Sequence, residues 1–143
     1  MGDRESTDAN TIALLGQAYS LLGFQIVDGV VGAGYPQNPK HSAVFAQIGP
    51  TGARVTDLAR GAGMTSQAMG EIVDELVELG YVIREPDPSD RRAKIVRLTP
   101  LGRKSIAAGA ATITAIEGRL DDLLGADGHA TLRSLLTTIL AAK

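Results

Sequence analysis

The sequence of 143 residues predicts a mainly α-helical protein that carries one small β-hairpin, an α+β fold. Two observations lead to this prediction. Apolar residues recur every three or four positions over most of the chain, which is the period of an amphipathic helix. The exception is a pair of β-rich runs, 81–85 and 94–98, separated by the turn-forming sequence Pro-Asp-Pro-Ser.

The composition predicts one domain, 1–143, that is long enough to bury a core of its own. The chain has no cysteine, which excludes disulfides, thiolate metal sites and thiol-based redox sensing. Residues 1–10 are polar and lack the apolar centre of a signal peptide. We expect every apolar stretch to fall short of the ~20 residues that a membrane span needs, and therefore a cytoplasmic protein without membrane contact.

The first predicted helix covers residues 10–31. Three glycines interrupt it, and each costs roughly 0.5–1 kcal/mol relative to alanine, so we expect packing against another element or subunit to hold it. After a glycine-containing break, Asn38 and Pro39 form the cap and first position of a short helix that extends to Ile48. The apolar stripe of the first helix consists of Leu15, Ala18, Leu22, Ile26 and Val30.

The next two predicted helices have the features of a helix-turn-helix. Thr56 is placed to cap the first of them, with Asp57 in its first turn, and Gly63 provides the turn. Thr65 caps the second, which ends at Gly80. The small and apolar residues that such a motif needs at the helix crossing are Ala59, Met69 and Ile72. The alternative is an ordinary helical hairpin within a core.

The hairpin that follows makes a winged helix-turn-helix over residues 38–99 the favoured interpretation. Its predicted tip, 90–94, reads Asp-Arg-Arg-Ala-Lys. The whole chain has a net charge of −2, but residues 84–104 hold seven basic and three acidic side chains. Because salt screens charges beyond about 8 Å, a phosphate responds to this local excess rather than to the total.

Thr99 and Pro100 begin a fifth helix, and residues 125–128 separate it from a last one. The terminal helices, 10–31 and 100–142, carry more apolar surface than a small monomer easily covers. We therefore expect them to pair in a homodimer.

The start of the second helix of the motif is the candidate DNA-reading segment. Its residues are expected to face base edges in the major groove. Gln67 can pair with adenine, and Ser66 can reach a base or a phosphate. The alternative is that Thr65 and Ser66 only cap the helix. The candidate residues here are Thr65, Ser66, Gln67, Gly70 and Glu71.

The wing supplies the second group of candidates. Arg92 on a narrow ribbon can enter the minor groove, where negative potential is strongest. Arg91 and Lys94 can contact phosphates, and Asp90 is expected to orient an arginine, since DNA repels a carboxylate. The alternative is a solvated charged turn.

At these residues the chain resembles the MarR family of bacterial transcriptional regulators, most strongly over residues 55–102. The family's wing signature is matched by Asp90-Arg91-Arg92-Ala93-Lys94-Ile95-Val96-Arg97-Leu98-Thr99. The resemblance implies an obligate dimer of the terminal helices that binds a pseudo-palindromic double-stranded DNA operator, usually as a repressor. It also implies that Arg92 is the wing-tip arginine with Asp90 as its partner.

The chain departs from the family pattern on the DNA-reading helix. Many members carry a hydroxyl where this chain has Gly70, and a basic residue where it has Glu71. An acidic side chain there weakens phosphate binding and can accept a hydrogen bond from cytosine N4. Operator preferences of other members therefore do not transfer.

The resemblance also implies a small effector, often a phenolic or aromatic acid, bound between the dimer helices and the winged lobe. Tyr35, His41 and Phe45 lie around the first helix junction and are candidates to line such a pocket. The alternative for all three is core packing. We expect such a ligand to release the protein from DNA, and we expect no cofactor.

The sequence gives little support to an enzyme. Its two histidines, His41 and His129, have no metal-ligand spacing, and neither a phosphate-binding loop nor a nucleophile elbow is present. Asp87 and Asp90 lie on a turn where nothing is expected to shift their pKa values. A winged-helix module that binds protein instead of DNA remains as the alternative function.

Overall fold

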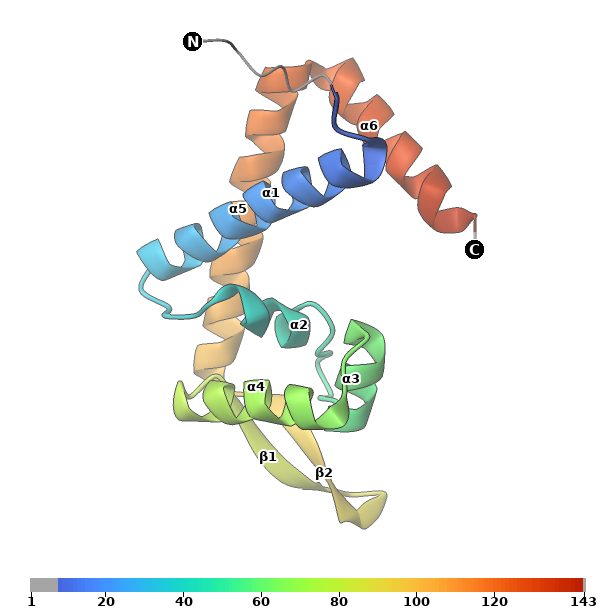
Figure 1. Ribbon diagram of the computed structural model, residues 1–143. Coiled ribbons are helices and arrows are strands. Elements are labelled where there is room, and N and C mark those ends of the chain that lie inside the picture. Colours follow the sequence, from blue (N-terminus) through green and yellow to red (C-terminus); the bar gives the residue numbers. More distant parts are fainter. Residues whose placement is uncertain (1–7, 143) are drawn as a thin grey trace.

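The computed structural model describes residues 8–142. In it α5 runs from the lower lobe to the far end of the molecule, α1 crosses α5, and α6 folds back from its end (Figure 1). The predicted mainly helical α+β fold is confirmed. The polar segment 1–7 and Lys143 lie outside the described residues. The elements are α1 (Thr11–Gly32), the 3₁₀ turn η2 (Pro39–His41), α2 (Ser42–Phe45), α3 (Val55–Ala62), α4 (Ser66–Glu78), β1 (Val82–Asp87), β2 (Asp90–Leu98), α5 (Pro100–Leu124) and α6 (Ala126–Ala141).

The helix α1 differs from the expectation for apolar stretches. It has 22 residues, its most apolar window has a mean hydropathy of 1.3, and its one charged side chain is Asp28. By length and composition it could cross a membrane, so the prediction that no stretch approaches that length is wrong here. The apolar stripe alone does not reveal this, because the residues between its members are mostly glycine and other uncharged residues. Only 6% of that window is buried within the chain.

The junction after α1 begins as predicted. The Asn38 side chain accepts a hydrogen bond from the Lys40 amide, and Pro39 occupies the first position. The helix is shorter than expected, because it starts as the 3₁₀ turn η2 and α2 then ends at Phe45 instead of extending to Ile48.

The helix-turn-helix is formed by α3 and α4. Gly63 ends α3 in the left-handed conformation (φ 65°), which costs a glycine little and other residues more. Thr65 caps α4 as predicted, since its hydroxyl accepts the Ala68 amide at 3.1 Å. α4 ends at Glu78, close to the predicted stop at Gly80.

The predicted cap of α3 is wrong. Thr56 lies inside the helix, which begins at Val55, and the N-cap is Arg54 without a side-chain cap. A β-bridge between Ala53 and Val96 holds the preceding backbone extended, and this sets the start of the helix one residue early. The Arg54 side chain instead binds Asp87.

The hairpin is longer than predicted. β1 and β2 pair antiparallel from Val82↔Leu98 to Pro86↔Lys94, and the register then jumps to Asp87↔Asp90. The turn is therefore residues 88–89, and the segment expected at the tip forms the start of β2. Residues 91–93 have no partner in this register, so they bulge from the strand.

The core lies in the lobe formed by α2, α3, α4 and the hairpin. Its buried residues come from all of these elements, so the lobe packs around one cluster. These residues are Val44, Ile48, Leu58, Ala59, Met69, Ile72, Val73, Leu76, Tyr81, Val82 and Val96.

The last two helices meet at a tighter elbow than predicted. Thr99 caps α5, as its hydroxyl accepts the Gly102 amide at 3.0 Å and Pro100 follows it. Only Gly125 (φ 75°) separates α5 from α6, which starts at Ala126 rather than after residue 128.

Candidate nucleic-acid interface

The first part of the candidate site is the N-terminal half of α4. Thr65 acts as the cap, while Ser66, Gln67 and Glu71 are exposed and Gly70 is half-buried. Nothing lies within 4 Å of where a Gly70 Cβ would be, so the helix surface is open there. The start of α4 therefore presents polar side chains to solvent and free backbone N–H groups beyond them.

The opposite face of α4 fixes the helix in the lobe. Met69, Val73 and Leu76 are completely buried, and Ile72 nearly so. Burial of side chains of this size stabilises a fold by about 1.5–3 kcal/mol each. The exposed residues of α4 are thus held on a rigid support.

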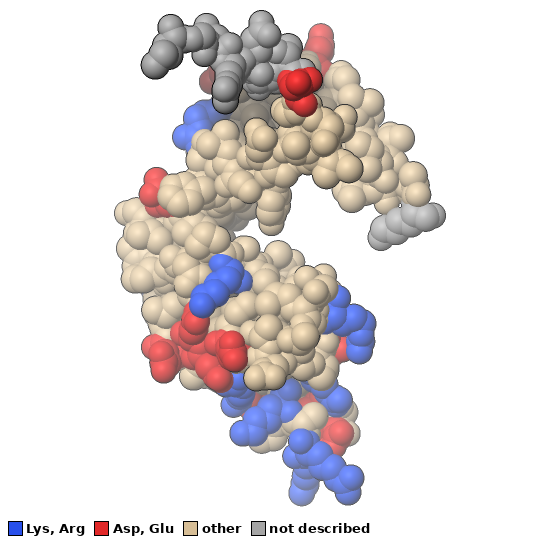
Figure 2. All heavy atoms as spheres, viewed as in Figure 1, with Lys and Arg blue, Asp and Glu red and all other residues tan. Residues whose placement is uncertain are grey.

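The second part of the site is the wing. It projects beneath α4, with its tip toward the end of the lobe that carries α3 and the start of α4 (Figure 1). Arg91, Arg92 and Lys94 are exposed, and within residues 8–142 none of them forms an ion pair. Figure 2 shows the Lys and Arg side chains gathered around the hairpin. The bulge at 91–93 carries both exposed arginines.

Asp90 contacts Arg92 in a different way than the sequence implied. Its carboxylate accepts the backbone amide of Arg92 at 3.0 Å, and no ion pair between the two side chains is present. The carboxylate therefore orders the backbone that carries Arg92 and leaves the guanidinium free.

Arg54 and Asp87 form a clasp at the turn end of the wing that the sequence did not reveal. Two guanidinium nitrogens of Arg54 donate to Asp87 Oδ2 at 2.8 and 2.6 Å, while the backbone amide and hydroxyl of Ser89 donate to Oδ1, each at 2.8 Å. Hydrogen bonds from Ser89, and then from Arg54, lower the pKa of the buried Asp87 from 3.8 to about 2. The expectation of an unshifted aspartate at this turn is wrong for Asp87. Turn chemistry indicated its contact with Ser89, but no local pattern links it to a residue 33 positions earlier.

Arg84 connects the wing to α4. Its guanidinium forms an ion pair with Asp74 at 2.7 Å and donates to the Gly70 carbonyl at 3.4 Å. The hairpin thus fixes the position of α4 as well as presenting basic side chains.

The three candidate effector residues lie at the junction of α1 with the lobe. Tyr35 and Phe45 are half-buried against the core, and Phe45 packs edge-to-face on Tyr81 at 5.9 Å. His41 is 2% exposed, and both its ring nitrogens form hydrogen bonds. These contacts fit the alternative of core packing, and an effector pocket at these residues stays a prediction.

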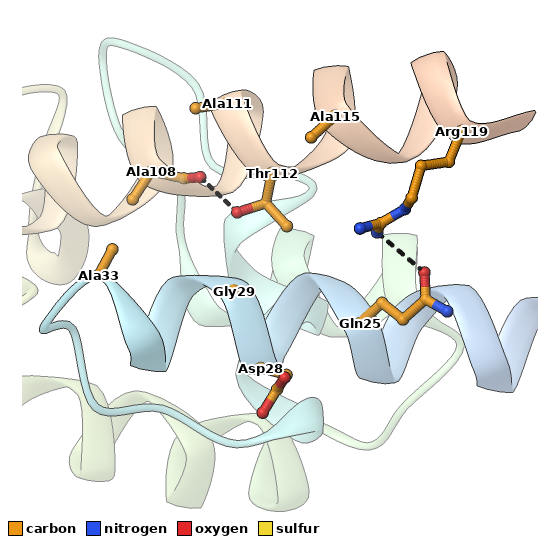
Figure 3. A pocket seen from close by; sticks show the side chains of 9 residues that line it. All are labelled: Gln25, Asp28, Gly29, Ala33, Ala108, Ala111, Thr112, Ala115 and Arg119. Atoms are coloured by element: carbon orange, nitrogen blue, oxygen red, sulfur yellow. Dashed lines mark hydrogen bonds between the residues drawn. The ribbon is translucent and has the colours of Figure 1, made fainter. Parts of the chain in front are cut away.

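Two hollows lie elsewhere, along the crossing of α1 and α5. The larger, about 800 Å³, is mostly lined by small residues, and Arg119 donates to Gln25 across it at 3.2 Å (Figure 3). The second, about 470 Å³, adjoins it and has an apolar wall. The larger is lined by Gln25, Asp28, Gly29, Ala33, Ala108, Ala111, Thr112, Ala115 and Arg119. Within residues 8–142, no group of three His, Cys, Asp or Glu side chains is arranged to hold a metal ion.

Comparison with known proteins places this geometry among DNA-binding regulators. A model described as "MarR family" matches residues 38–93, which span the lobe and most of the wing. The uncharacterized HTH-type transcriptional regulator YcgE of Bacillus subtilis (strain 168) is 31% identical over 72 residues, which are 50% of this chain and 46% of YcgE. The chain thus aligns with just under half the length of that relative.

Solved structures resemble the chain over nearly its whole length. The transcriptional repressor CouR bound to a 23-mer DNA duplex has a TM-score of 0.78 and 26% identity, covering 98% of this chain and 99% of CouR. CouR of Rhodococcus jostii RHA1 bound to p-coumaroyl-CoA has a TM-score of 0.72 at 24% identity, covering 99% of this chain and 98% of that protein. A probable transcriptional regulator from Pseudomonas aeruginosa has a TM-score of 0.74 at 28% identity, covering 93% of this chain and 98% of the regulator.

Proposed function

We propose that the chain is a MarR-type dimeric transcriptional regulator that binds double-stranded DNA sequence-specifically, since a MarR-family model matches residues 38–93 and the DNA-bound repressor CouR shares the fold. One observation carries the proposal: a single lobe presents an exposed helix start beside a wing with three exposed cations free of carboxylate partners in the described chain. A helix of this kind fits the major groove, and a basic ribbon beside it reaches the backbone or the minor groove.

Residues at the start of α4 read the bases. Gln67 and Ser66 reach base edges, and Thr65 positions them as the cap. Glu71 lies one turn further along the helix, where it accepts a hydrogen bond from a cytosine amino group. The absence of a side chain at Gly70 lets the helix approach the DNA closely.

The wing supplies backbone and minor-groove contacts. Arg92 enters the minor groove, while Arg91 and Lys94 neutralise phosphates. Each neutralised phosphate adds roughly 0.9 to the slope of log affinity against log salt concentration. Asp90 keeps the backbone of Arg92 in place.

A homodimer explains the apolar surface of the terminal helices. Ile12, Tyr19 and Phe24 on α1 are exposed, as are Leu135 and Ile139 on α6. A second copy that covers them by two-fold symmetry presents two copies of α4, and these match a pseudo-palindromic operator. The same interface accounts for an α1 that is apolar enough for a membrane but belongs to a DNA-binding protein, which we place in the cytoplasm.

We further propose that the protein is a repressor that a small aromatic or phenolic ligand releases from DNA. Two structures of proteins named CouR support this: one is described as a transcriptional repressor bound to a DNA duplex, and the other, from Rhodococcus jostii RHA1, is bound to p-coumaroyl-CoA. Tyr35, His41 and Phe45 remain the predicted pocket, and Ala33, two residues before Tyr35 in sequence, lines the hollow between α1 and α5. A panel of phenolic acids and their thioesters, screened by thermal shift and by release of labelled DNA, tests the proposal. If no compound produces a response, the ligand hypothesis fails while DNA binding stands.

Fluorescence anisotropy with DNA from upstream of the protein's own gene tests DNA binding. The measurement uses a salt series and a scrambled duplex of the same composition. Arg92→Ala is compared with Arg133→Ala, which removes an exposed arginine from α6, outside the lobe. We expect specific binding that weakens steeply with salt and falls about tenfold or more in Arg92→Ala only.

Two results would contradict the proposal. Equal affinity for the operator and the scrambled duplex at every salt concentration would contradict sequence-specific reading. An absence of binding even at low salt would favour the alternative of a winged-helix module that binds protein.

A further inference from the structure

A hydrogen-bonded chain connects the α1–lobe junction to the DNA-reading helix. The backbone amide of Asn38 donates to Nδ1 of His41 at 3.2 Å, and Nε2 of the same ring lies 2.8 Å from Oε2 of Glu75 on α4. The other Glu75 oxygen accepts from Lys40 Nζ at 2.7 Å. Two residues of one 3₁₀ turn therefore hold a single carboxylate of α4.

The tautomer of His41 follows from these partners. A backbone amide can only donate, so Nδ1 must be an acceptor without a proton. The proton of the neutral ring then lies on Nε2, which donates to Glu75. Since His41 is 2% exposed, water has little access to either bond. The Lys40 ammonium and the His41 ring, in that order, lower the pKa of Glu75 and keep the acceptor ionised.

Glu75 is placed where it controls the rotation of α4 about its axis. Successive helix residues are about 100° apart, so Asp74 and Glu75 mark two flanks of the same helix. Asp74 is bound by Arg84 from β1, and Glu75 by His41 from η2. Together the two contacts hold α4 at two points about 100° apart around its axis, while its buried face packs on the core.

The size of the effect on DNA reading can be estimated. Side-chain tips lie about 6 Å from a helix axis, so a 20° rotation moves the tip of Gln67 by about 2 Å. Hydrogen bonds to base edges tolerate only a few tenths of an ångström. Glu71 and Gln67 are one and two turns before Glu75, so a rotation about the helix axis displaces both.

We propose that His41 is a positioning residue for DNA reading, which sets the rotation of α4 through its Nε2–H hydrogen bond to Glu75. The proposal rests on the proposed DNA-binding function. It assigns His41 a role separate from that of an effector-pocket residue. It predicts a loss of discrimination between DNA sequences, because no phosphate contact is removed.

Paired variants separate the two hydrogen bonds of the ring. In His41→Asn the side-chain oxygen takes the position of Nδ1 and keeps the cap, but nothing reaches Glu75. In His41→Gln the amide nitrogen takes the position of Nε2 and keeps the bond to Glu75. Glu75→Gln keeps a side-chain oxygen that can accept from the His41 ring, so it should preserve the function that Glu75→Ala loses by removing this acceptor. Lys40→Ala is the matched control, since it deletes the exposed partner of the same carboxylate.

The experiment measures anisotropy of the full-length protein with operator and scrambled duplexes over a salt series. We expect His41→Asn and Glu75→Ala to lower operator affinity about tenfold, with unchanged scrambled-duplex affinity and salt slope. His41→Gln, Glu75→Gln and Lys40→Ala should remain within about threefold of wild type. The double variant of His41→Asn and Glu75→Ala should be no weaker than either single variant, because both remove the same bond.

Long-range ¹H–¹⁵N correlation of the imidazole provides a readout independent of DNA. We expect a protonated Nε2 and an unprotonated Nδ1, with the Nε2 signal shifted in Glu75→Ala. The opposite tautomer would overturn the proposal, as would an operator-to-scrambled affinity ratio of the wild-type size in Glu75→Ala. If His41→Asn fails to fold, Glu75→Ala still decides, since Glu75 lies on the surface of α4. Wild-type protein that does not discriminate between the duplexes would instead contradict the proposed function itself.

Discussion

The DNA-binding lobe and the terminal helices are built in opposite ways from one chain. Among the described residues, all buried core side chains except Val30 and Ile116 lie in the lobe. Conversely, all exposed large apolar side chains except Val77 and Ile83 lie on α1, α5 or α6. The lobe has covered its apolar surface within the chain, whereas the terminal helices have left theirs uncovered.

The ion pairs of the two regions also differ in which elements they connect. In the lobe, several ion pairs connect residues far apart in sequence, such as Arg54 with Asp87 and Lys40 with Glu75. Among the described residues of the terminal helices, ion pairs connect only α5 with α6, the next helix in the chain, such as Glu117 with Arg133. The lobe can therefore define its shape alone, while in the proposed homodimer the arrangement of the terminal helices depends on a second copy.

The largest expected effect comes from breaking the subunit contact. Leu135→Lys combined with Ile139→Lys places charges on the exposed face of α6. Four side chains per two-fold dimer lose about 1.5 kcal/mol each, or roughly 6 kcal/mol, which weakens dimerisation by about 10⁴-fold. Light scattering after gel filtration should show monomers, and operator affinity should collapse. Val77→Lys, the same change at an exposed apolar position in the lobe, should leave the dimer intact; a dimeric double variant would contradict the proposed interface.

A cavity in the lobe should have the next largest effect. Met69 is completely buried, so Met69→Ala should lower the free energy of unfolding by about 3 kcal/mol. Ile113→Ala on α5, at a residue 44% exposed in one chain, should cost less than 1 kcal/mol in dilute monomeric protein. Urea unfolding at several protein concentrations measures both changes. If Ile113→Ala lowered the free energy of unfolding as much as Met69→Ala at every protein concentration, the terminal helices would already pack within one chain.

The elements that the sequence predicted correctly are those specified by neighbouring residues. The caps at Asn38, Thr65 and Thr99 each need one side chain and an amide two or three positions later. The turn at Gly63 needs only the backbone freedom of glycine. Such local signals can be recognised from the sequence without knowledge of the fold.

The errors concern features that depend on distant partners. Thr56 has the chemistry of a cap, but the bridge from Ala53 to Val96 fixes where α3 begins. The contact of His41 with Glu75 was missed for the same reason, because the two residues are 34 positions apart. Asp87 looked solvated because Arg54 is equally remote. For the candidate site, sequence named the exposed residues, but the contacts that position them required the tertiary structure.

Two glycines should respond in opposite directions to the same substitution. Gly63→Ala forces a Cβ into the left-handed conformation at the end of α3 and should cost about 1 kcal/mol. Gly118→Ala, in the interior of α5 with no atom within 4 Å, should stabilise the protein by about 0.5–1 kcal/mol. Thermal unfolding measures the two shifts. Destabilisation by Gly118→Ala that grows with protein concentration would place that face of α5 inside the subunit contact.

The smallest effect should appear in the pH dependence of the wing clasp. The pKa of Asp87 is lowered to about 2 in the folded protein, whereas an unfolded aspartate titrates near 3.8. The clasp therefore contributes its full stability above pH 3.8 and loses it as the pH falls toward 2. The difference in unfolding free energy between wild type and Asp87→Asn should be constant from pH 7 to about 5 and should shrink below pH 4. Ser89→Ala removes one of the two Ser89 donors and should show a smaller effect in the same pH range. A difference that does not change between pH 5 and pH 2.5 would mean that Arg54 and Ser89 do not bind the ionised carboxylate, and the wing would then be held to the self-contained lobe without this clasp.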